Sequence, residues 1–345
     1  MKAAVYYSNE DIRIEEVPVP KISNREILVK VIASGVCGSD VMEWYRLKKA
    51  PLVLGHEVAG IIEEAGSKVK DFKVGDRVVI AHHVPCNVCY YCLMDKHTIC
   101  ETLRKTNFEP GGFCEYVRVP EINITNGGIF LLPDKLTYEE ASFVEPLACV
   151  VRAQRLLQIR AGMTVLVFGT GISGILHVAL ARALGASNII GVDVSKFRIE
   201  SALSNGATYA FLFNDFNEET LLRINNNRFA DVVILSTGAP AAIESALKYL
   251  KRGGNLLIFA PSPPDYIYKI NFNEVFWRNE IHIISSYAGA PIDYYTALQL
   301  LRYENIKVKN MITHRLSLTE IKQAYKLVSE AKNSLKVIIQ PHGDI

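Results

Sequence analysis

The sequence predicts a two-domain α/β protein, in which a β-rich, barrel-like domain is joined to a domain built on a doubly wound parallel sheet. Two observations carry this prediction. The chain has 345 residues, and domains usually run to about 100–200 residues. Its pattern also changes near Val150, from closely spaced short strands to an alternation of strands and helices. We place the first domain at residues 1–147 and 288–345, and the second at residues 148–287.

The first domain is predicted from short apolar runs that end in turn residues. Two such turns are Ala65-Gly66-Ser67 and Val74-Gly75, where glycine permits the backbone angles of a tight turn. The predicted strands are Lys2–Tyr7, Ile27–Ala33, Val58–Glu63 and Asp76–Ala81. Short strands at this spacing indicate a barrel-like sheet.

The second domain is predicted from regular alternation, which favours parallel strands joined by crossover helices. The predicted strands are Val165–Phe168, Asn188–Val192, Tyr209–Phe213, Asp231–Leu235, Asn255–Ala260 and Ile281–Ser285. The predicted helices are Ile172–Leu184, Lys196–Asn205 and Ala241–Tyr249. After them come two helices and a strand that we expect to return to the first domain: Tyr294–Tyr303, Leu318–Ala331 and Leu335–Ile339.

Composition excludes several classes of protein. A formal charge of +2 and a pI near 8.1 are too mild for a dedicated nucleic-acid binder. No apolar stretch approaches the roughly 18 residues of a membrane span, so we expect no membrane partner. Met1 opens directly into a strand-like run without a leader pattern. We therefore expect a reduced, cytoplasmic setting.

Four of the seven cysteines fall within fifteen residues, in the pattern Cys86-x2-Cys89-x2-Cys92-x7-Cys100. Paired thiolates on tight turns can hold Zn²⁺ tetrahedrally at about 2.3 Å, with no position left for water. Two disulfides are the alternative, but a chain of this length does not need them for stability. The spacing predicts a structural zinc that holds a loop.

A dinucleotide-binding pattern follows the first predicted strand of the second domain. It reads Gly169-Thr170-Gly171-Ile172-Ser173-Gly174 and opens a helix, so that a pyrophosphate can approach backbone N–H groups at the helix N-terminus. Asp193 closes the next strand, where a carboxylate accepts hydrogen bonds from ribose hydroxyls and repels the 2′-phosphate of NADP. NAD is therefore the predicted cofactor. Arg198, a further cofactor-binding candidate, and Lys196 leave NADP open.

Two further motifs lie in the first domain, Gly35-Val36-Cys37-Gly38-Ser39-Asp40 and Gly55-His56-Glu57. Taken alone, Cys37 and His56 would more often be ordinary buried residues. Together with the four clustered cysteines and the glycine motif, they resemble the zinc-dependent alcohol dehydrogenases of the medium-chain dehydrogenase/reductase superfamily. Within that superfamily, the resemblance is to the sorbitol and threonine dehydrogenase type. The resemblance covers the whole chain. It implies a GroES-like catalytic domain and a Rossmann NAD-binding domain.

The resemblance also implies a catalytic zinc, the second of two per subunit. Cys37 and His56 match its first two ligands, and Asp40 matches the carboxylate that orients the histidine. Glu57 matches a carboxylate beside the metal that can replace or hold its water. Glu145, in the segment Glu145-Pro146-Leu147, matches the third ligand of sorbitol and threonine dehydrogenases. Cys149 is a competitor, and an ordinary carboxylate at a helix N-terminus is the alternative for Glu145.

The implied chemistry is oxidation of a secondary alcohol, with hydride passing to NAD⁺. Ser39 matches the hydroxyl that takes the alcohol proton first. Many family members pass that proton to a histidine three residues later, where this chain has Met42, so the exit route must differ. His83 resembles a histidine near the active site of threonine dehydrogenases.

The expected substrate is a small-molecule alcohol, most simply a polyol. The alternatives are an L-threonine 3-dehydrogenase and a zinc- and NAD-binding protein without turnover, although the intact ligand motifs argue against the second. An apolar edge strand at Ile281–Ser285 predicts a homodimer, or a homotetramer built from such dimers.

Overall fold

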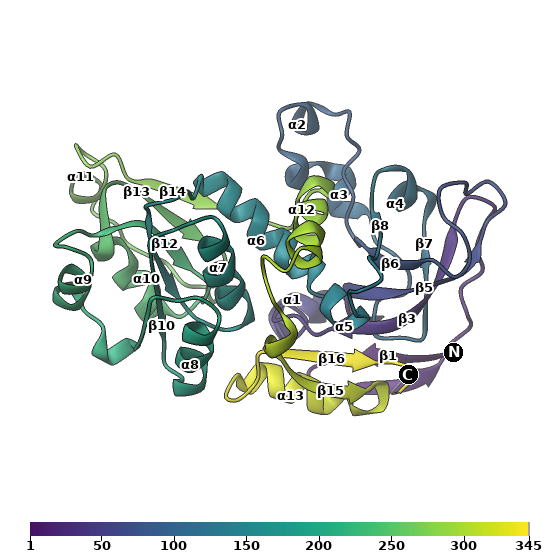
Figure 1. Ribbon diagram of the computed structural model, residues 1–345. Helices are drawn as coiled ribbons and strands as arrows, with labels where there is room; N and C mark the ends of the chain where they lie inside the picture. Colours follow the sequence, from purple (N-terminus) through teal and green to yellow (C-terminus); the bar gives the residue numbers. More distant parts are fainter. Residues whose placement is uncertain (344–345) are drawn as a thin grey trace. The chain divides into compact units, whose positions relative to one another are not determined.

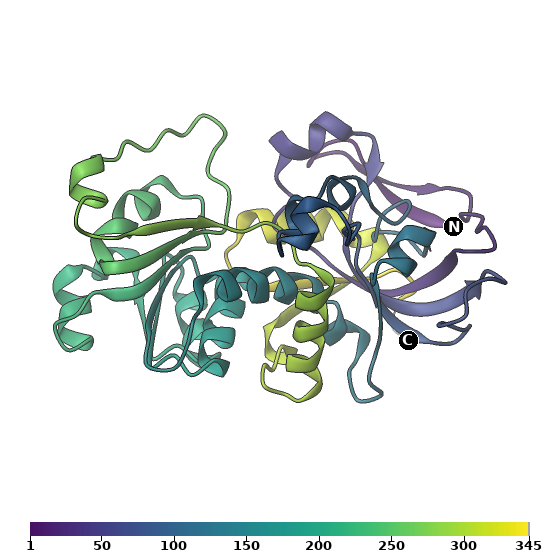
Figure 2. The same cartoon turned by 90° about the horizontal axis from the view of Figure 1, so that it is seen from above.

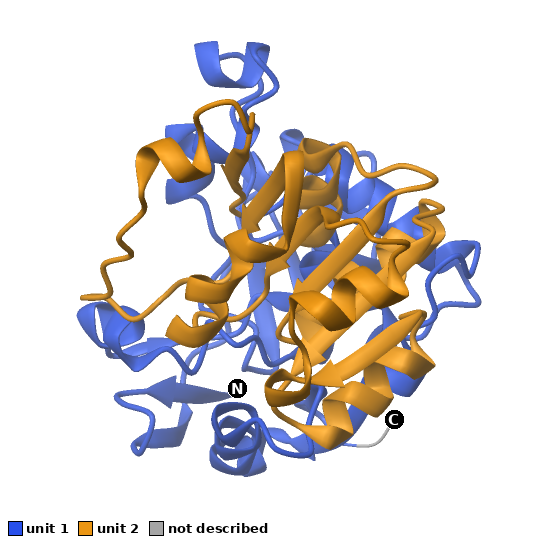
Figure 3. Cartoon of the chain, turned by 90° about the vertical axis from the view of Figure 1, so that its left-hand side faces the viewer, with its two compact units in different colours: residues 1–148, 288–345 blue, residues 149–287 orange. Residues whose placement is uncertain are grey.

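The computed structural model describes residues 1–343 and divides the chain into two compact units. Unit 1 comprises Met1–Ala148 and Ala288–Ile345, and unit 2 comprises Cys149–Tyr287. Figure 3 shows the two units in different colours. These limits lie one residue from the domain limits expected from the sequence at the first junction and coincide with them at the second.

Unit 1 is built on a mostly antiparallel sheet to which the end of the chain contributes, with one parallel pair, β15 and β16. Its strand order is β15-β16-β3-β5-β6-β8, and β7 also pairs with β3. The strands are β3 (Ile27–Gly35), β5 (Glu57–Ala65), β6 (Arg77–Ile80), β7 (Tyr116–Val119), β8 (Ile129–Leu131), β15 (Ile312–Ser317) and β16 (Lys336–Gln340). The yellow C-terminal strands therefore lie beside the purple N-terminal ones (Figure 1), as expected for a tail that returns to the first domain.

A smaller sheet in unit 1 has the order β2-β1-β4. It consists of β1 (Lys2–Tyr6), β2 (Ile12–Glu16) and β4 (Leu52–Val53). The helices of unit 1 are mostly short. They are α1 (Glu43–Arg46), α2 (Tyr90–Leu93), α3 (Glu101–Lys105), α4 (Glu121–Thr125), α5 (Tyr138–Ala141), α12 (Pro291–Arg302) and α13 (Ile321–Glu330). Helix α6 (Val144–Leu157) continues from unit 1 into unit 2.

Unit 2 is a parallel sheet with the strand order β11-β10-β9-β12-β13-β14. The strands are β9 (Thr164–Phe168), β10 (Asn188–Asp193), β11 (Tyr209–Leu212), β12 (Ala230–Leu235), β13 (Leu250–Ile258) and β14 (His282–Ser285). Numbered within the unit, this is the 3-2-1-4-5-6 order of a doubly wound dinucleotide fold. The predicted fold class is thus confirmed.

Helices cover both faces of this sheet (Figures 1 and 2). They are α7 (Ile172–Ala183), α8 (Lys196–Ser204), α9 (Glu218–Ile224), α10 (Pro240–Ala246) and the short α11 (Phe272–Val275). Successive side chains of β9 point to opposite faces: Val165 and Val167 pack in one core with α6 and α7, whereas Leu166 and Phe168 pack in another with α9 and α10. This explains why the predicted strand is apolar without alternation.

Candidate active site and metal centres

Three potential metal ligands meet in unit 1, at the start of β5 and just after β3. The thiol of Cys37, the imidazole of His56 and the carboxylate of Glu57 offer ligand atoms that all lie within 4.8 Å of one another. A soft thiolate, an imidazole and a carboxylate form a donor set that suits Zn²⁺, and three protein ligands leave a fourth position for another molecule. We call these three residues the open ligand group.

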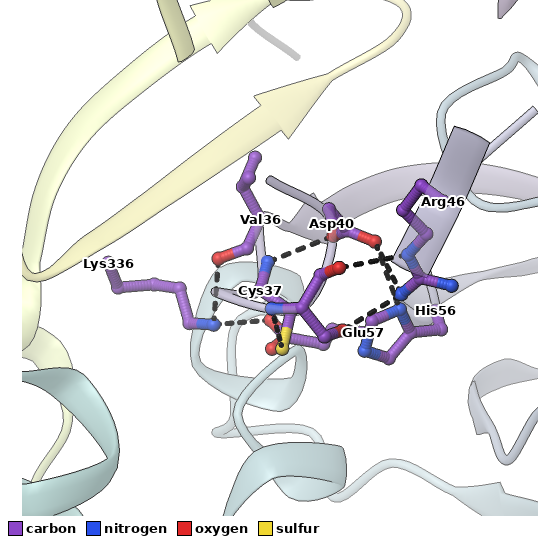
Figure 4. Close-up of polar contacts among 8 residues, drawn as sticks. Val36, Cys37, Asp40, Arg46, His56, Glu57 and Lys336 are labelled. Carbon is purple, nitrogen blue, oxygen red and sulfur yellow. Dashed lines mark hydrogen bonds and ion pairs between the residues drawn. The ribbon is translucent and has the colours of Figure 1, made fainter. Parts of the chain in front are cut away.

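Asp40 orients two members of this group (Figure 4). Its Oδ2 accepts a hydrogen bond of 3.0 Å from the backbone N–H of Cys37, and its Oδ1 lies 3.4 Å from Nδ1 of His56. Asp40 is fully buried, and burial alone would raise the pKa of its carboxyl. The charges of His56 and Arg46 and the hydrogen bonds outweigh burial and hold that pKa below its ordinary value. An ionised Asp40 leaves Nε2 of His56 to face a metal.

Glu57 has a partner that the sequence did not reveal. Nζ of Lys336 makes an ion pair with its Oε2 and a 3.5 Å hydrogen bond to the carbonyl oxygen of Val36 (Figure 4). The side chains of Lys336 and Glu57 are 0 % and 1 % exposed. Gly35 makes room for the pair, because a Cβ there would lie 2.0 Å from Oε2 of Glu57. A lysine in the apolar strand Leu335–Ile339 was the available signal.

The expected third ligand, Glu145, does not join the open ligand group in the described part of the chain, where Glu57 takes that place. Glu145 is the second residue of α6 and is 6 % exposed. The helix begins at Val144, two residues before the expected start at Pro146. Glu57 directly follows His56, so the strand that supplies one ligand also brings the other. Sequence spacing alone does not distinguish between two glutamates so far apart.

Two adjacent histidines, His82 and His83, follow His56 in a series of ring contacts. The ring centre of His82 lies 5.0 Å from that of His56 and 3.9 Å from that of His83, with the two rings of the second pair tilted by 42°. Nδ1 of His83 donates to the carbonyl oxygen of Thr106 at 2.9 Å. Burial lowers the pKa of His83 to about 4 against that hydrogen bond, so the ring is neutral at pH 7. His82 is the histidine beside the open ligand group, and the sequence analysis missed it.

The four cysteines converge as the spacing predicted. Their sulfur atoms lie within 4.8 Å of one another, with Sγ–Sγ distances of 3.6 Å for Cys89–Cys92 and Cys100–Cys86 and 4.0 Å for Cys86–Cys92. Four sulfurs at 2.3 Å from one zinc ion would be about 3.8 Å apart, whereas a disulfide needs about 2.05 Å. All seven cysteines, which lie within the described residues 1–343, are free thiols. The geometry therefore fits a closed tetrahedral zinc site.

Hydrogen bonds to the sulfur atoms stabilise the segment Cys86–Cys100 in this conformation. The backbone N–H of Cys89 donates to Sγ of Cys86 at 3.3 Å, and that of Cys86 donates to Sγ of Cys100 at 3.4 Å. Backbone hydrogen bonds overcome the effect of burial and lower the pKa of the Cys100 thiol to about 6. A thiol that ionises readily is suited to metal binding.

The glycine motif has the local geometry that it predicted. Gly169 follows β9 with φ +82°, a conformation that favours glycine, and Gly171 precedes α7 as its N-cap. Gly174 permits close packing, because a Cβ there would lie 1.9 Å from the carbonyl oxygen of Gly169. Oδ2 of Asp193 accepts a 2.7 Å hydrogen bond from the N–H of Thr170, which ties the loop to the end of β10.

Asp193 and Arg198 lie together beside this loop. Oδ1 of Asp193 accepts from the N–H of Ser195 at 3.0 Å, and Nη1 of Arg198 lies 3.8 Å from Oδ2. A carboxylate has about four acceptor positions, so Asp193 keeps acceptor capacity for a ligand hydroxyl. The Arg198 guanidinium stands 3.5 Å from where a Cβ of Gly171 would be. These groups fit a dinucleotide on the loop.

Comparisons with known proteins agree with this geometry. Residues 23–129 match the alcohol dehydrogenase GroES-like domain, and residues 173–302 match the zinc-binding dehydrogenase domain. The chain is 34 % identical to the sorbitol dehydrogenase of Bacillus subtilis strain 168, over 99 % of this chain and 98 % of the relative.

Solved structures cover the same span. One is 2R,3R-butanediol dehydrogenase from Bacillus subtilis (26 % identity, TM-score 0.85, 99 % of each chain). Another, from Sinorhizobium meliloti 1021, was solved bound to NADP (30 % identity, TM-score 0.86, 99 % of each chain). The fold and site define a zinc-dependent oxidoreductase with a nicotinamide cofactor. The chain belongs to the zinc-dependent medium-chain dehydrogenase/reductase family and is sorbitol dehydrogenase-like within it, which confirms the family expected from the motifs.

Proposed function

We propose that this protein oxidises a secondary alcohol of a polyol to the ketone, with NAD⁺ as the hydride acceptor. The observation that carries the proposal is the open ligand group, in which three different donors converge and leave a position for substrate oxygen. The named activities of the sorbitol and butanediol dehydrogenases support a substrate with neighbouring hydroxyls. In this proposal unit 1 holds the metals and unit 2 holds NAD.

The residues take the following roles. Cys37, His56 and Glu57 hold the catalytic zinc, Asp40 orients His56, and Ser39 takes the substrate proton. Bound zinc supplies a Lewis acid that lowers the pKa of a hydroxyl placed against it, and bound NAD⁺ supplies the hydride acceptor. Glu145 stays a predicted ligand of this zinc. The second zinc is bound by Cys86, Cys89, Cys92 and Cys100.

A second set of residues would bind the cofactor. The loop Gly169–Gly174, which includes Thr170, Ile172 and Ser173, would bind the pyrophosphate at the N-terminus of α7. Asp193 would bind the ribose hydroxyls. Arg198 would lie beside the adenosine end, and the NADP-bound relative is a reason to test both cofactors.

A substrate panel tests the proposal. Zinc-loaded protein is assayed for NADH or NADPH formation with polyols, hydroxy amino acids including threonine, and simple alcohols. Polyols should be oxidised fastest, and NAD⁺ should be preferred. Cys37→Ala should abolish turnover. Cys114→Ala is a matched control, because the Cys114 thiol bonds only to backbone carbonyls of Gly111 and Tyr116 and belongs to neither ligand group. If protein fully loaded with zinc oxidises none of these alcohols, it is a zinc- and NAD-binding protein without turnover instead.

Assembly and setting are part of the proposal. Among the described residues, β14 is one of the two edge strands of the unit 2 sheet, and Ile283 on it is 38 % exposed. An apolar edge tends to pair with another strand, so we propose a homodimer through β14, or a homotetramer of such dimers. Light scattering should give that mass, and Ile283→Lys should reduce it to a monomer. No helix of residues 1–343 is long and apolar enough to cross a membrane. Seven free thiols suit a reducing compartment such as the cytoplasm.

A further inference from the structure

Arg46 contacts the proposed proton-accepting serine at two points. Its Nε donates to the carbonyl oxygen of Ser39 at 2.8 Å, and its Nη2 donates to Oγ of Ser39 at 2.9 Å. Nη2 also lies 3.4 Å from Oδ1 of Asp40. The side chain of Arg46 is only 13 % exposed, and its guanidinium lies 4.8 Å from the ring centre of Tyr45. Both backbone and side chain of Ser39 are therefore fixed by one planar group.

The loop that carries Arg46 is itself held in place. Nδ2 of Asn9 donates to the carbonyl oxygen of Val41 at 2.9 Å, and the N–H of Asn9 donates to Oε1 of Glu43 at 3.0 Å. The N–H of Arg46 then donates to the carbonyl oxygen of Met42 at 3.1 Å. Residues before and within α1 are thus anchored to the turn between β1 and β2. Arg46 reaches Ser39 from a rigid support, as a positioning group requires.

We infer that Arg46 is a positioning residue for proton removal, which fixes Ser39 Oγ to receive the substrate proton and directs the proton of Ser39 to water. The inference rests on the proposed function. Met42 stands where many relatives have a histidine, and thioether sulfur is not a proton carrier at neutral pH. The position that would pass the proton onward is therefore filled by a side chain that cannot do so.

The number of hydrogen bonds that Ser39 Oγ can make explains the direction in which the proton moves. A hydroxyl has one proton and two lone pairs, and a guanidinium only donates. Arg46 occupies one lone pair of Ser39 Oγ, which leaves one lone pair to accept and one proton to give. In the reaction the substrate O–H proton moves to Oγ, and the proton of Ser39 moves to water. The carbon-bound hydrogen leaves with both electrons to NAD⁺, so the products are ketone, NADH and a hydrated proton.

The test compares four variants of the zinc-loaded protein with wild type: Arg46→Met, Arg46→Lys, Ser39→Ala and the double variant Arg46→Met/Ser39→Ala. Arg46→Met should lower kcat by about 10–100-fold, within the range of acid–base contributions, and should change KM little. The solvent deuterium isotope effect on kcat should rise, because proton removal becomes slower. Arg46→Lys should recover part of kcat, and so should added guanidinium. Lys49→Met is the matched control, because Lys49 also lies over Tyr45, at 5.6 Å, and its ammonium has no hydrogen bond to Ser39.

The double variant decides whether Arg46 acts through Ser39. If it does, Arg46→Met should cause no further loss of kcat once Ser39 is alanine. Zinc content and melting temperature, which do not depend on activity, should stay near wild type. Additive losses, a rise in KM alone, or loss of zinc would overturn the inference in favour of a substrate-binding or structural role. A wild-type protein that oxidises no alcohol would refute the proposed function instead, before any variant is compared.

Discussion

The Lys336–Glu57 pair allows a quantitative prediction, because both charges are removed from water. Lys336→Met keeps most of the length of the side chain and removes its charge. The carboxylate of Glu57 then stays 1 % exposed against Gly35 without its cation, and the carbonyl oxygen of Val36 loses its hydrogen bond from Lys336. The ring of Phe143, 5.6 Å from Nζ, loses its cation as well.

Breaking a buried ion pair from one side costs about 3–5 kcal/mol, because the remaining charge is left uncompensated. For a folding unit of about two hundred residues, each kcal/mol shifts the melting temperature by about 2–4 °C, so Lys336→Met should lower it by about 6–20 °C. The double variant Lys336→Met/Glu57→Gln should be closer to wild type than either single variant, since no charge is left unpaired.

Calorimetry or thermal circular dichroism on protein without the catalytic zinc measures these shifts, because a zinc ion bound at Glu57 would itself compensate the carboxylate. Lys326→Met is a matched control on α13, since Lys326 is 75 % exposed in an i,i+4 pair with Glu330 and should contribute nothing measurable. The prediction is wrong if Lys336→Met melts at the same temperature as the control Lys326→Met. It is also wrong if the melting temperature of the double variant falls by as much as the sum of the falls in the two single variants.

Five other substitutions have defined outcomes. Cys92→Ser should remove one zinc per subunit and lower the melting temperature while the other zinc stays; metal analysis decides. Glu57→Ala should lose the other zinc, and Glu145→Ala should lose it only if Glu145 is the ligand; full zinc in Glu57→Ala would contradict our assignment. Asp193→Gly should weaken the binding of NAD⁺ and raise the preference for NADP⁺ over NAD⁺ about tenfold or more, which is roughly 1.4 kcal/mol. An unchanged cofactor preference would argue against the role of Asp193. Burial lowers the pKa of His177 to about 3, so only the unfolded chain binds its proton between pH 6.5 and 3, and stability falls as pH falls through that range. His177→Leu should flatten this fall by up to about 1.4 kcal/mol per pH unit in denaturant titrations.

Much of unit 2 could be predicted because its strands and helices carry local signals. The predicted strand Asn188–Val192 and helix Ile172–Leu184 differ from β10 and α7 by one residue each. The strand predicted from Asn255 begins at Leu250, because β13 continues through Gly253 and Gly254 with a shift in register. Glycine pairs are a turn signal in sequence, but here they are an irregularity inside a strand.

Parts of unit 1 could not be predicted, because long-range pairing determines them. Strand β15 has the mixed sequence Ile312–Ser317 and gains its strand conformation by pairing with β16. The helix expected from Leu318 is a 3₁₀ turn followed by α13, which starts at Ile321. At the site, only the contacts between residues close in sequence could be predicted. Cys37 and Asp40 are related by a local turn in which the N–H of Asp40 donates to the carbonyl of Cys37 at 3.0 Å, so the motif alone predicts their proximity.

Two basic residues, Arg46 and Lys336, form ion pairs at the site that the sequence motifs do not predict. Two buried carboxylates at the site, one beside the open ligand group and one within it, each have a cation: Arg46 lies beside Asp40, and Lys336 lies beside Glu57. Their charges offset those of the two acids before a metal arrives. The cations therefore hold both carboxylates in fixed positions, as a metal ligand and its orienting partner require. One cation comes from α1 and the other from the end of the chain, which explains why no local pattern predicted this arrangement.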